Sequence, residues 1–210
     1  IFLGGFMAAG KTSVGTALGE RTGRPFVDTD RIIEQRAGKS VAQIFATSGE
    51  AVFRQMERRV VKELSQLQGM IVALGGGVLT DPVLKSVIMD RGTLVVLSVL
   101  PETALRRAAK EEGKRPLLDP EKVNDLWKRR IPAYSNGHLV IDTDHMTIED
   151  EVERIMEALE LHTSSGDHPM EMFEARAGRN TYPVFIGSGI LGSLEEFCRQ
   201  RAGETLVLAD

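Results

Sequence analysis

The feature that most restricts the fold of this chain is a glycine-rich loop close to its first residue. Residues 5–12 read Gly-Phe-Met-Ala-Ala-Gly-Lys-Thr and match the pattern Gly-x4-Gly-Lys-[Ser/Thr] of a phosphate-binding loop. The loop follows the apolar segment Ile1–Leu3 and precedes a helical pattern over Thr12–Arg21, which is the strand-loop-helix setting that the motif requires. Such a chain is expected to fold as an α/β protein.

The same loop predicts a binding site for a nucleoside triphosphate. Successive backbone amides at a helix N-terminus form an anion site, in which the ammonium group of Lys11 neutralises phosphate charge. The hydroxyl group of Thr12 is a suitable ligand for Mg²⁺. The residues expected to contact the nucleotide here are Ala8, Ala9, Gly10, Lys11, Thr12 and Ser13.

The rest of the chain alternates short apolar runs with longer amphipathic runs, which is typical of parallel βαβ units. Strands are predicted at Ile1–Leu3, Pro25–Val27, Met70–Leu74, Leu94–Leu97 and Leu139–Ile141. Helices between them include Arg31–Ala37, Val41–Thr47 and Glu50–Gln68. We therefore predict a doubly wound, five-stranded parallel sheet within residues 1–161. Residues 162–170 form a polar linker, and residues 171–210 form a small α+β segment that opens with a hairpin.

Composition excludes several classes of protein. A hydrophobic fraction of 42% is sufficient for a packed core, and a formal net charge of −4 argues against a nucleic-acid coat. The longest apolar run, Leu94–Leu100, is too short to span a membrane. The single cysteine, Cys198, cannot close an intrachain disulfide, as expected for a reducing compartment. The expectation is a cytoplasmic protein without a nucleic-acid or membrane partner.

Two carboxylates narrow the class of P-loop protein. The chain lacks the Asn-Lys-x-Asp element with which a GTPase reads guanine. Its interior apolar strands also do not end in the acidic residue that organises Mg²⁺ in a motor or transporter ATPase. The acids instead follow the second strand, in Asp28-Thr29-Asp30. Residues two apart on a strand point to the same side, so both carboxylates should face a ligand beside the loop. Alternatively, Asp30 only caps the helix that begins at Arg31.

Six motifs, taken in order, resemble those of shikimate kinases. They are Gly-x-Met-x-x-Gly-Lys-Thr at 5–12, Asp28-x-Asp30, Gly49-Glu50-x-x-Phe53-Arg54-x-x-Glu57, Gly75-Gly76-Gly77, Arg115-Pro116-Leu117-Leu118 and Arg130-x-Pro132-x-Tyr134. The resemblance implies a nucleoside-monophosphate-kinase-like fold with strand order 2-3-1-4-5. It also implies transfer of the γ-phosphoryl group of ATP to the 3-hydroxyl group of shikimate, in aromatic amino-acid biosynthesis.

The resemblance further implies roles for residues on the nucleotide side. Lys11 and Thr12 would hold phosphate and Mg²⁺, and Asp28 would contact the metal. Arg115 would lie on a lid and meet charge on the transferring phosphoryl group. Arg107 is the nearest match to an arginine that stacks on adenine, because the expected position holds Ala108. Ala8 replaces a usual glycine, which is tolerable if its φ angle is negative.

On the acceptor side, the resemblance implies a site for shikimate itself. Asp30 would bind the shikimate hydroxyl groups and accept a proton. Arg54 and Arg130 would hold the shikimate carboxylate, with Glu57 orienting Arg54 from one helical turn away. The glycines would let backbone amides approach the substrate; they are Gly75, Gly76 and Gly77.

The C-terminal residues carry a resemblance of their own. Residues 179–191, from Arg179 to Leu191, are similar to the opening of 3-dehydroquinate synthase. This implies the kinase half of a bifunctional enzyme, cut shortly after a second domain begins. The alternative is a β-hairpin appendage to the kinase.

Two other functions remain open from the residues alone. A P-loop identifies the phosphoryl donor and not the acceptor, so a gluconate-type kinase on the same fold is the nearest rival. A nucleotide-binding regulatory module without turnover is the second. A module that only binds has no use for both a lid arginine and an acceptor site, so the intact set argues against it: Asp30, Arg54, Arg115 and Arg130.

Overall fold

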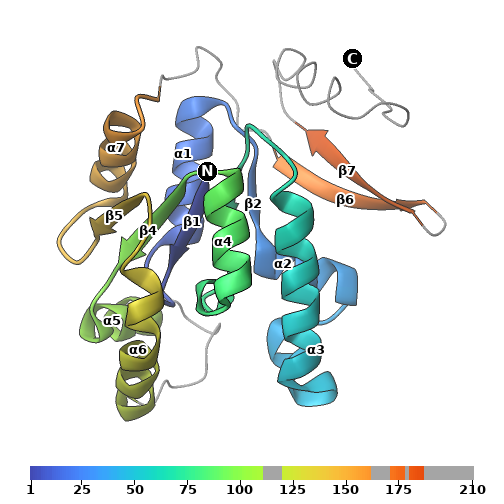
Figure 1. The fold of residues 1–210 in the computed structure, drawn as a ribbon, viewed down its shortest axis with the longest axis horizontal. Coiled ribbons are helices and arrows are strands. Elements are labelled where there is room, and N and C mark those ends of the chain that lie inside the picture. The colour runs from blue at the N-terminus through green and yellow to red at the C-terminus, as the bar shows by residue number, and fades with distance from the viewer. Residues whose placement is uncertain (111–119, 162–170, 178–179, 187–210) are drawn as a thin grey trace.

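A parallel sheet with helices on both faces forms the body of the protein (Figure 1). The computed structural model describes residues 1–110, 120–161, 171–177 and 180–186. The strands of the body are β1 (Phe2–Gly5), β2 (Phe26–Asp28), β3 (Ile71–Ala73), β4 (Leu94–Ser98) and β5 (Leu139–Asp142). They pair in parallel in the order β5-β4-β1-β3-β2, so the predicted order 2-3-1-4-5 is confirmed.

Helices follow each strand of the body. They are α1 (Lys11–Thr22), α2 (Thr29–Ala37), α3 (Val41–Leu64), the 3-10 helix η1 (Val78–Thr80), α4 (Pro82–Arg91), α5 (Pro101–Lys110), α6 (Pro120–Tyr134) and α7 (Ile148–Ala158). In Figure 1, α4 lies in front of the sheet and α1 behind it. Strand β4 is covered on both faces, which explains why Leu94–Leu97 is an unbroken and fully buried apolar run.

The hairpin predicted after the linker forms, and it joins the edge of the sheet. Strands β6 (Glu171–Ala177) and β7 (Asn180–Ile186) pair antiparallel, and β6 adds to β2 in parallel through the pair Phe26↔Glu171. The rest of the predicted α+β segment, residues 187–210, lies outside the described residues. Within the part of the chain that is described, no helix is long and apolar enough to cross a membrane.

Helix α3 is interrupted between Thr47 and Glu50, where the break between two predicted helices lies. It runs from Val41 to Leu64 with a kink at Gly49, whose φ of 81° and ψ of 167° interrupt the helical path. The predicted end at Gln68 was too late, because the chain leaves the helix at Ser65. The N-cap of α3 is Ser40, which forms a reciprocal capping box with Gln43. The part of α3 after the kink carries Arg54 and Glu57 into the site described below.

Candidate active site

The glycine-rich loop lies at the carboxyl end of β1, in the middle of the sheet. Gly10, with φ of 93°, precedes α1, and no side chain caps the amides of the first turn of that helix. Lys11 Nζ donates to the carbonyl oxygens of Gly5 (3.0 Å) and Phe6 (2.8 Å), which holds the ammonium group over the loop. Uncapped amides at a helix N-terminus beside a lysine make a site for a phosphate group.

Ala8 has a left-handed backbone conformation. Its φ is +56°, and the only other described non-glycine residue with positive φ is Glu160. The condition under which alanine would be unstrained is therefore not met. The Cβ atom of an L-residue in this region meets its own backbone, so the loop retains local strain.

Replacing Ala8 with glycine should raise the free energy of unfolding by up to about 1 kcal/mol, because glycine adopts positive φ without strain. Ala9 is the matched control, since it is buried and is not among the positive-φ residues. Ala9→Gly should lower stability by about 0.4–1 kcal/mol through the entropy of the unfolded chain. Urea unfolding of the two variants checks this, and equal losses in both would contradict the strain at Ala8.

Asp28 and Asp30 sit at the junction of β2 and α2, but not as two residues of one strand. Helix α2 begins at Thr29, one residue after the end of β2 at Asp28. The N-cap is Asp28, whose Oδ1 accepts from the amide of Asp30 at 2.9 Å, so the suggested capping role of Asp30 was wrong. Asp28 Oδ2 accepts from the hydroxyl group of Thr12 at 2.9 Å. Two oxygen groups predicted to bind Mg²⁺ are thus in direct contact.

The carboxyl group of Asp30 is the most perturbed group on the acceptor side. Its Oδ1 atom is buried and has no hydrogen-bond partner in the structure. Burial, reinforced by the nearby carboxylates of Asp28 and Glu57 and opposed by the charge of Lys11, raises the pKa of Asp30 to about 6. A buried, unpaired carboxyl group with a raised pKa, close to a phosphate-binding lysine, is typical of a functional site.

The three glycines form the turn that joins the two halves of the site. A Cβ atom on Gly75 would lie 2.6 Å from Oδ1 of Asp30 and 2.9 Å from Oε1 of Glu57. A Cβ atom on Gly77 would lie 2.8 Å from Cζ of Arg54. These contacts explain why glycine is needed at both positions. The carboxylates and guanidinium group therefore pack directly against this turn.

Gly76, between them, faces both the loop and α6. A Cβ atom there would lie 3.5 Å from Nη1 of Arg130 and 3.8 Å from the backbone nitrogen of Met7. The carbonyl oxygen of Gly76 accepts from Arg130 Nη1 at 3.0 Å and from the hydroxyl group of Tyr134 at 2.5 Å. The phosphate-binding loop and Arg130 thus meet at Gly76.

Arg54 is held between two carboxylates of very different exposure. Its Nη1 donates to Oε2 of Glu57 at 2.7 Å, as predicted from their spacing, and the side chain of Glu57 is only 3% exposed. Its Nε and Nη2 donate to Oε1 of Glu50, whose side chain is 66% exposed. The guanidinium also lies over the ring of Phe53, 5.5 Å from the centroid. One edge of Arg54 is fixed in the protein, and the other is turned to solvent.

Arg107 lies on α5 against the strand-to-helix connection after β5. It donates from Nη1 to the hydroxyl group of Thr143 at 3.2 Å and from Nη2 to the carbonyl oxygen of the same residue. Arg115 lies outside the described residues. No role was predicted for Thr29, whose buried hydroxyl group accepts from the amide of Gly75 at 2.8 Å, nor for Tyr134 and Glu151. Tyr134 was at least marked by its motif, whereas nothing in the sequence distinguished the other two.

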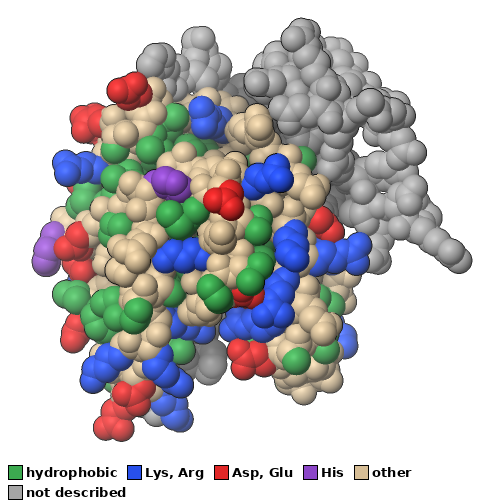
Figure 2. Space-filling view, in the orientation of Figure 1, with side chains coloured by type: hydrophobic (Ala, Val, Ile, Leu, Met, Phe, Trp, Pro, Cys, Tyr) green, Lys and Arg blue, Asp and Glu red, His purple; other side chains and the backbone are tan. Residues whose placement is uncertain are grey.

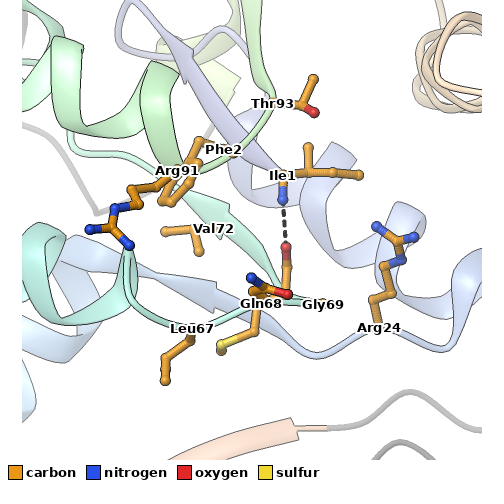
Figure 3. Close-up of a pocket in the computed structure, with 11 residues that line it drawn as sticks. Ile1, Phe2, Arg24, Leu67, Gln68, Gly69, Val72, Arg91 and Thr93 are labelled. Carbon is orange, nitrogen blue, oxygen red and sulfur yellow. Dashed lines mark hydrogen bonds between the residues drawn. The ribbon is translucent and has the colours of Figure 1, made fainter. Parts of the chain in front are cut away.

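Two other surface features are separate from this site. A cavity of about 160 Å³ lies near the starts of β1, β3 and β4, at the end of the sheet opposite the loop, and Arg24 and Arg91 are among the residues that line it (Figure 3). Lysines and arginines also gather over α3 and α4 (Figure 2). There Arg58 pairs with Asp81 at 2.6 Å, an exposed ion pair of the kind that contributes little to stability.

The fold and the site together define a class. A phosphate-binding loop after the central strand of a 2-3-1-4-5 sheet, next to a cluster of carboxylates and guanidinium groups, is the arrangement of a P-loop kinase that acts on a small molecule. The family model described as shikimate kinase matches residues 7–160. The chain belongs to the shikimate kinase family, whose members are ATP-dependent kinases.

Individual relatives agree with this assignment. The chain is 38% identical over 169 residues to a shikimate kinase of Thermus thermophilus, covering 79% of this chain and 92% of that protein. It is 41% identical over 167 residues to a shikimate kinase of Symbiobacterium thermophilum, covering 76% and 95%. The solved shikimate kinase of Acinetobacter baumannii in complex with shikimate is 35% identical, with a TM-score of 0.71 and coverage of 76% and 91%.

Proposed function

We propose that this protein transfers the γ-phosphoryl group of ATP to the 3-hydroxyl group of shikimate, giving shikimate 3-phosphate and ADP. The observation that carries the proposal is the Gly75–Gly77 turn, which contacts Asp30, Arg54, Arg130 and the phosphate-binding loop. A donor site and a site for an anionic acceptor are therefore neighbours. The family assignment and the solved relative with bound shikimate support this choice of acceptor.

The nucleotide side uses the loop residues 8–13. Their amides and Lys11 bind the phosphates, which places the γ-phosphoryl group near the glycine turn. The contact between Thr12 and Asp28 offers hydroxyl and carboxylate oxygens, the ligands that Mg²⁺ prefers, so these residues would hold that ion. When bound, Mg²⁺ neutralises phosphate charge. Arg107, on α5, would stack on the adenine base of ATP.

The acceptor side orients the substrate by its carboxylate. Glu50 already occupies the outer edge of Arg54 as a carboxylate, and its exposure means that exchange for a substrate carboxylate costs little. Arg130, beside Gly76, supplies the second cation. Asp30 then meets the hydroxyl group and accepts its proton once the carboxyl group is ionised.

An assay of ADP release with separate acceptors tests the function. With shikimate the enzyme should release ADP well above the rate in buffer alone, whereas quinate and gluconate should be poorer acceptors. Preference for gluconate would favour the rival sugar-acid kinase, and equal ADP release in all four conditions would exclude both kinases.

Replacing Arg54 with lysine should raise the KM for shikimate about tenfold and leave kcat nearly unchanged. Lysine keeps a positive charge beside buried Glu57 but lacks the fork that binds a carboxylate through two hydrogen bonds. The acceptor's carboxylate does not react, so its contacts act mainly on binding. Steady-state kinetics check this, with Arg58→Lys on the same helix as the control. A change confined to kcat would contradict the role.

We infer from the resemblance of residues 179–191 that the protein is the kinase half of a fusion with 3-dehydroquinate synthase, with residues 162–170 as the linker. An aromatic amino-acid pathway enzyme of this kind would act in the cytoplasm.

A further inference from the structure

Glu151 is a buried carboxylic acid next to the nucleotide side of the site, and no role has been given to it above. It lies in the first turns of α7, which packs on α1, and only 3% of its side chain is exposed. An ionisable group is rarely buried to this extent unless it is paired. Its neighbours therefore decide its charge.

One carboxylate oxygen of Glu151 faces Arg107. The distance from Oε1 to Nη2 of Arg107 is 3.9 Å, too long for a hydrogen bond but short enough for strong attraction at a buried position. Arg107 instead donates hydrogen bonds to the hydroxyl group and the carbonyl oxygen of Thr143. Glu151 and Arg107 therefore attract each other without a direct hydrogen bond between them.

The other oxygen faces the phosphate-binding loop. Oε2 of Glu151 is buried and has no hydrogen-bond partner in the structure. A Cβ atom on Gly10 would lie 3.7 Å from it. Gly10 precedes the uncapped N-terminus of α1, where phosphate groups are expected to bind. A carboxyl group on Glu151 and a bound phosphate would therefore be close neighbours.

The balance of these effects leaves the acid able to titrate near neutral pH. Burial is the main cause that raises the pKa of Glu151 to about 7, with Arg107 on α5 opposing the rise and Asp150 on the same helix adding to it. The positive N-terminal end of the α1 helix dipole also favours the ionised form of Glu151. Phosphate charge arriving at that helix end would favour the neutral form.

We propose that Glu151 is a positioning residue of the nucleotide site, which couples the binding of a nucleoside triphosphate to the uptake of one proton. This rests on the proposed function, because it needs ATP at the loop. Without nucleotide, the carboxylate faces Arg107, which is bonded to Thr143. With nucleotide, Glu151 takes a proton from the solvent, which removes its repulsion of the phosphates and leaves Arg107 bound to Thr143.

The sign of the pH dependence follows directly. Below about pH 7 the acid is protonated in both states, and ATP affinity is at its highest. As the pH rises above this value, the carboxylate must be neutralised on binding, so affinity falls. We expect MgATP to bind about tenfold more weakly at pH 8.5 than at pH 6.5. In Glu151→Gln the affinity should change far less.

Calorimetry without an acceptor tests this in the full chain. MgATP is titrated at pH 7.5 into wild type, Glu151→Gln and the control Glu153→Gln, in two buffers of different ionisation enthalpy. Wild type and Glu153→Gln, an exposed position on the same helix, should take up about half a proton more than Glu151→Gln. Asp30 is common to all three proteins, so its contribution cancels.

Each outcome decides one question. Equal proton uptake in wild type and Glu151→Gln would overturn the role of Glu151 while leaving the kinase intact. If Glu151→Gln does not fold, a wild-type affinity that is constant between pH 6.5 and 8.5 overturns it equally well. Absence of any MgATP binding to wild type would instead overturn the proposed function.

Discussion

Asp30→Asn should lower kcat for phosphoryl transfer to shikimate about a hundredfold or more, the usual contribution of a positioned general base. Asparagine keeps the shape of the side chain but cannot accept the proton of the attacking hydroxyl group. A loose, metaphosphate-like transition state needs little proton transfer at the start, which keeps the expected loss at the lower end of that range.

The pH profile separates proton transfer from simple positioning. The pKa of Asp30 is raised to about 6, so wild-type kcat should fall as the pH drops below that value, and Asp30→Asn should lose this limb. The folded protein also binds the Asp30 proton more tightly than the unfolded chain, so the ionised group destabilises the fold at neutral pH. Asp30→Asn should therefore melt at a higher temperature than wild type.

Two results would contradict this account. A kcat in Asp30→Asn equal to that of the wild type would contradict the role of Asp30 as a general base. An unchanged melting temperature would contradict the claim that burial of its ionised carboxylate destabilises the fold. The control is Asp90→Asn on α4, an exposed carboxylate remote from the turn in sequence, which should change neither quantity.

Arg115→Ala should lower kcat about a thousandfold, the effect expected of an arginine that meets charge on a transferring phosphoryl group. The resemblance of the Arg-Pro-Leu-Leu motif to that of shikimate kinases implies this role for Arg115. Lys11 is already placed over the loop carbonyl oxygens, so the moving phosphoryl group needs a second cation from another segment. Charge that develops only in the transition state is felt in kcat.

Full steady-state kinetics of this variant distinguish the two arginine roles. Lys114→Ala removes a neighbouring positive charge without the guanidinium group and serves as the control. If Lys114→Ala loses as much activity as Arg115→Ala, the effect is one of local net charge. If Arg115→Ala changes only the KM for shikimate, Arg115 binds the acceptor and the assigned roles are reversed.

Local patterns in the sequence determined the class of fold. The phosphate-binding loop demands a strand before it and a helix after it, and the apolar runs had the length of buried parallel strands. The spacing of Arg54 and Glu57 on one helix sufficed to predict their ion pair, because three residues make almost one turn. These features depend only on residues close together along the chain, so they can be predicted from the sequence alone.

Backbone details at helix ends were decided by the tertiary structure. The acidic pair after β2 was read as two strand positions, but the chain turns into α2 at Thr29, so Asp28 is the cap and Asp30 points into the site from a helix. The loop forces Ala8 to a positive φ although alanine normally avoids it. In both cases packing around the site overrides the local preference of the residue.

The resemblance to shikimate kinases listed the site residues, but the sequence alone left their contacts open. The Gly75–Gly77 turn contacts Asp30 from α2, Arg54 from α3 and Arg130 from α6, and each separation along the chain is too long for local rules. Burial likewise leaves one oxygen each of Asp30, Glu57 and Glu151 without a partner. Sequence order specifies which side chains exist, whereas long-range packing decides which of them lose water, and loss of water sets their charge.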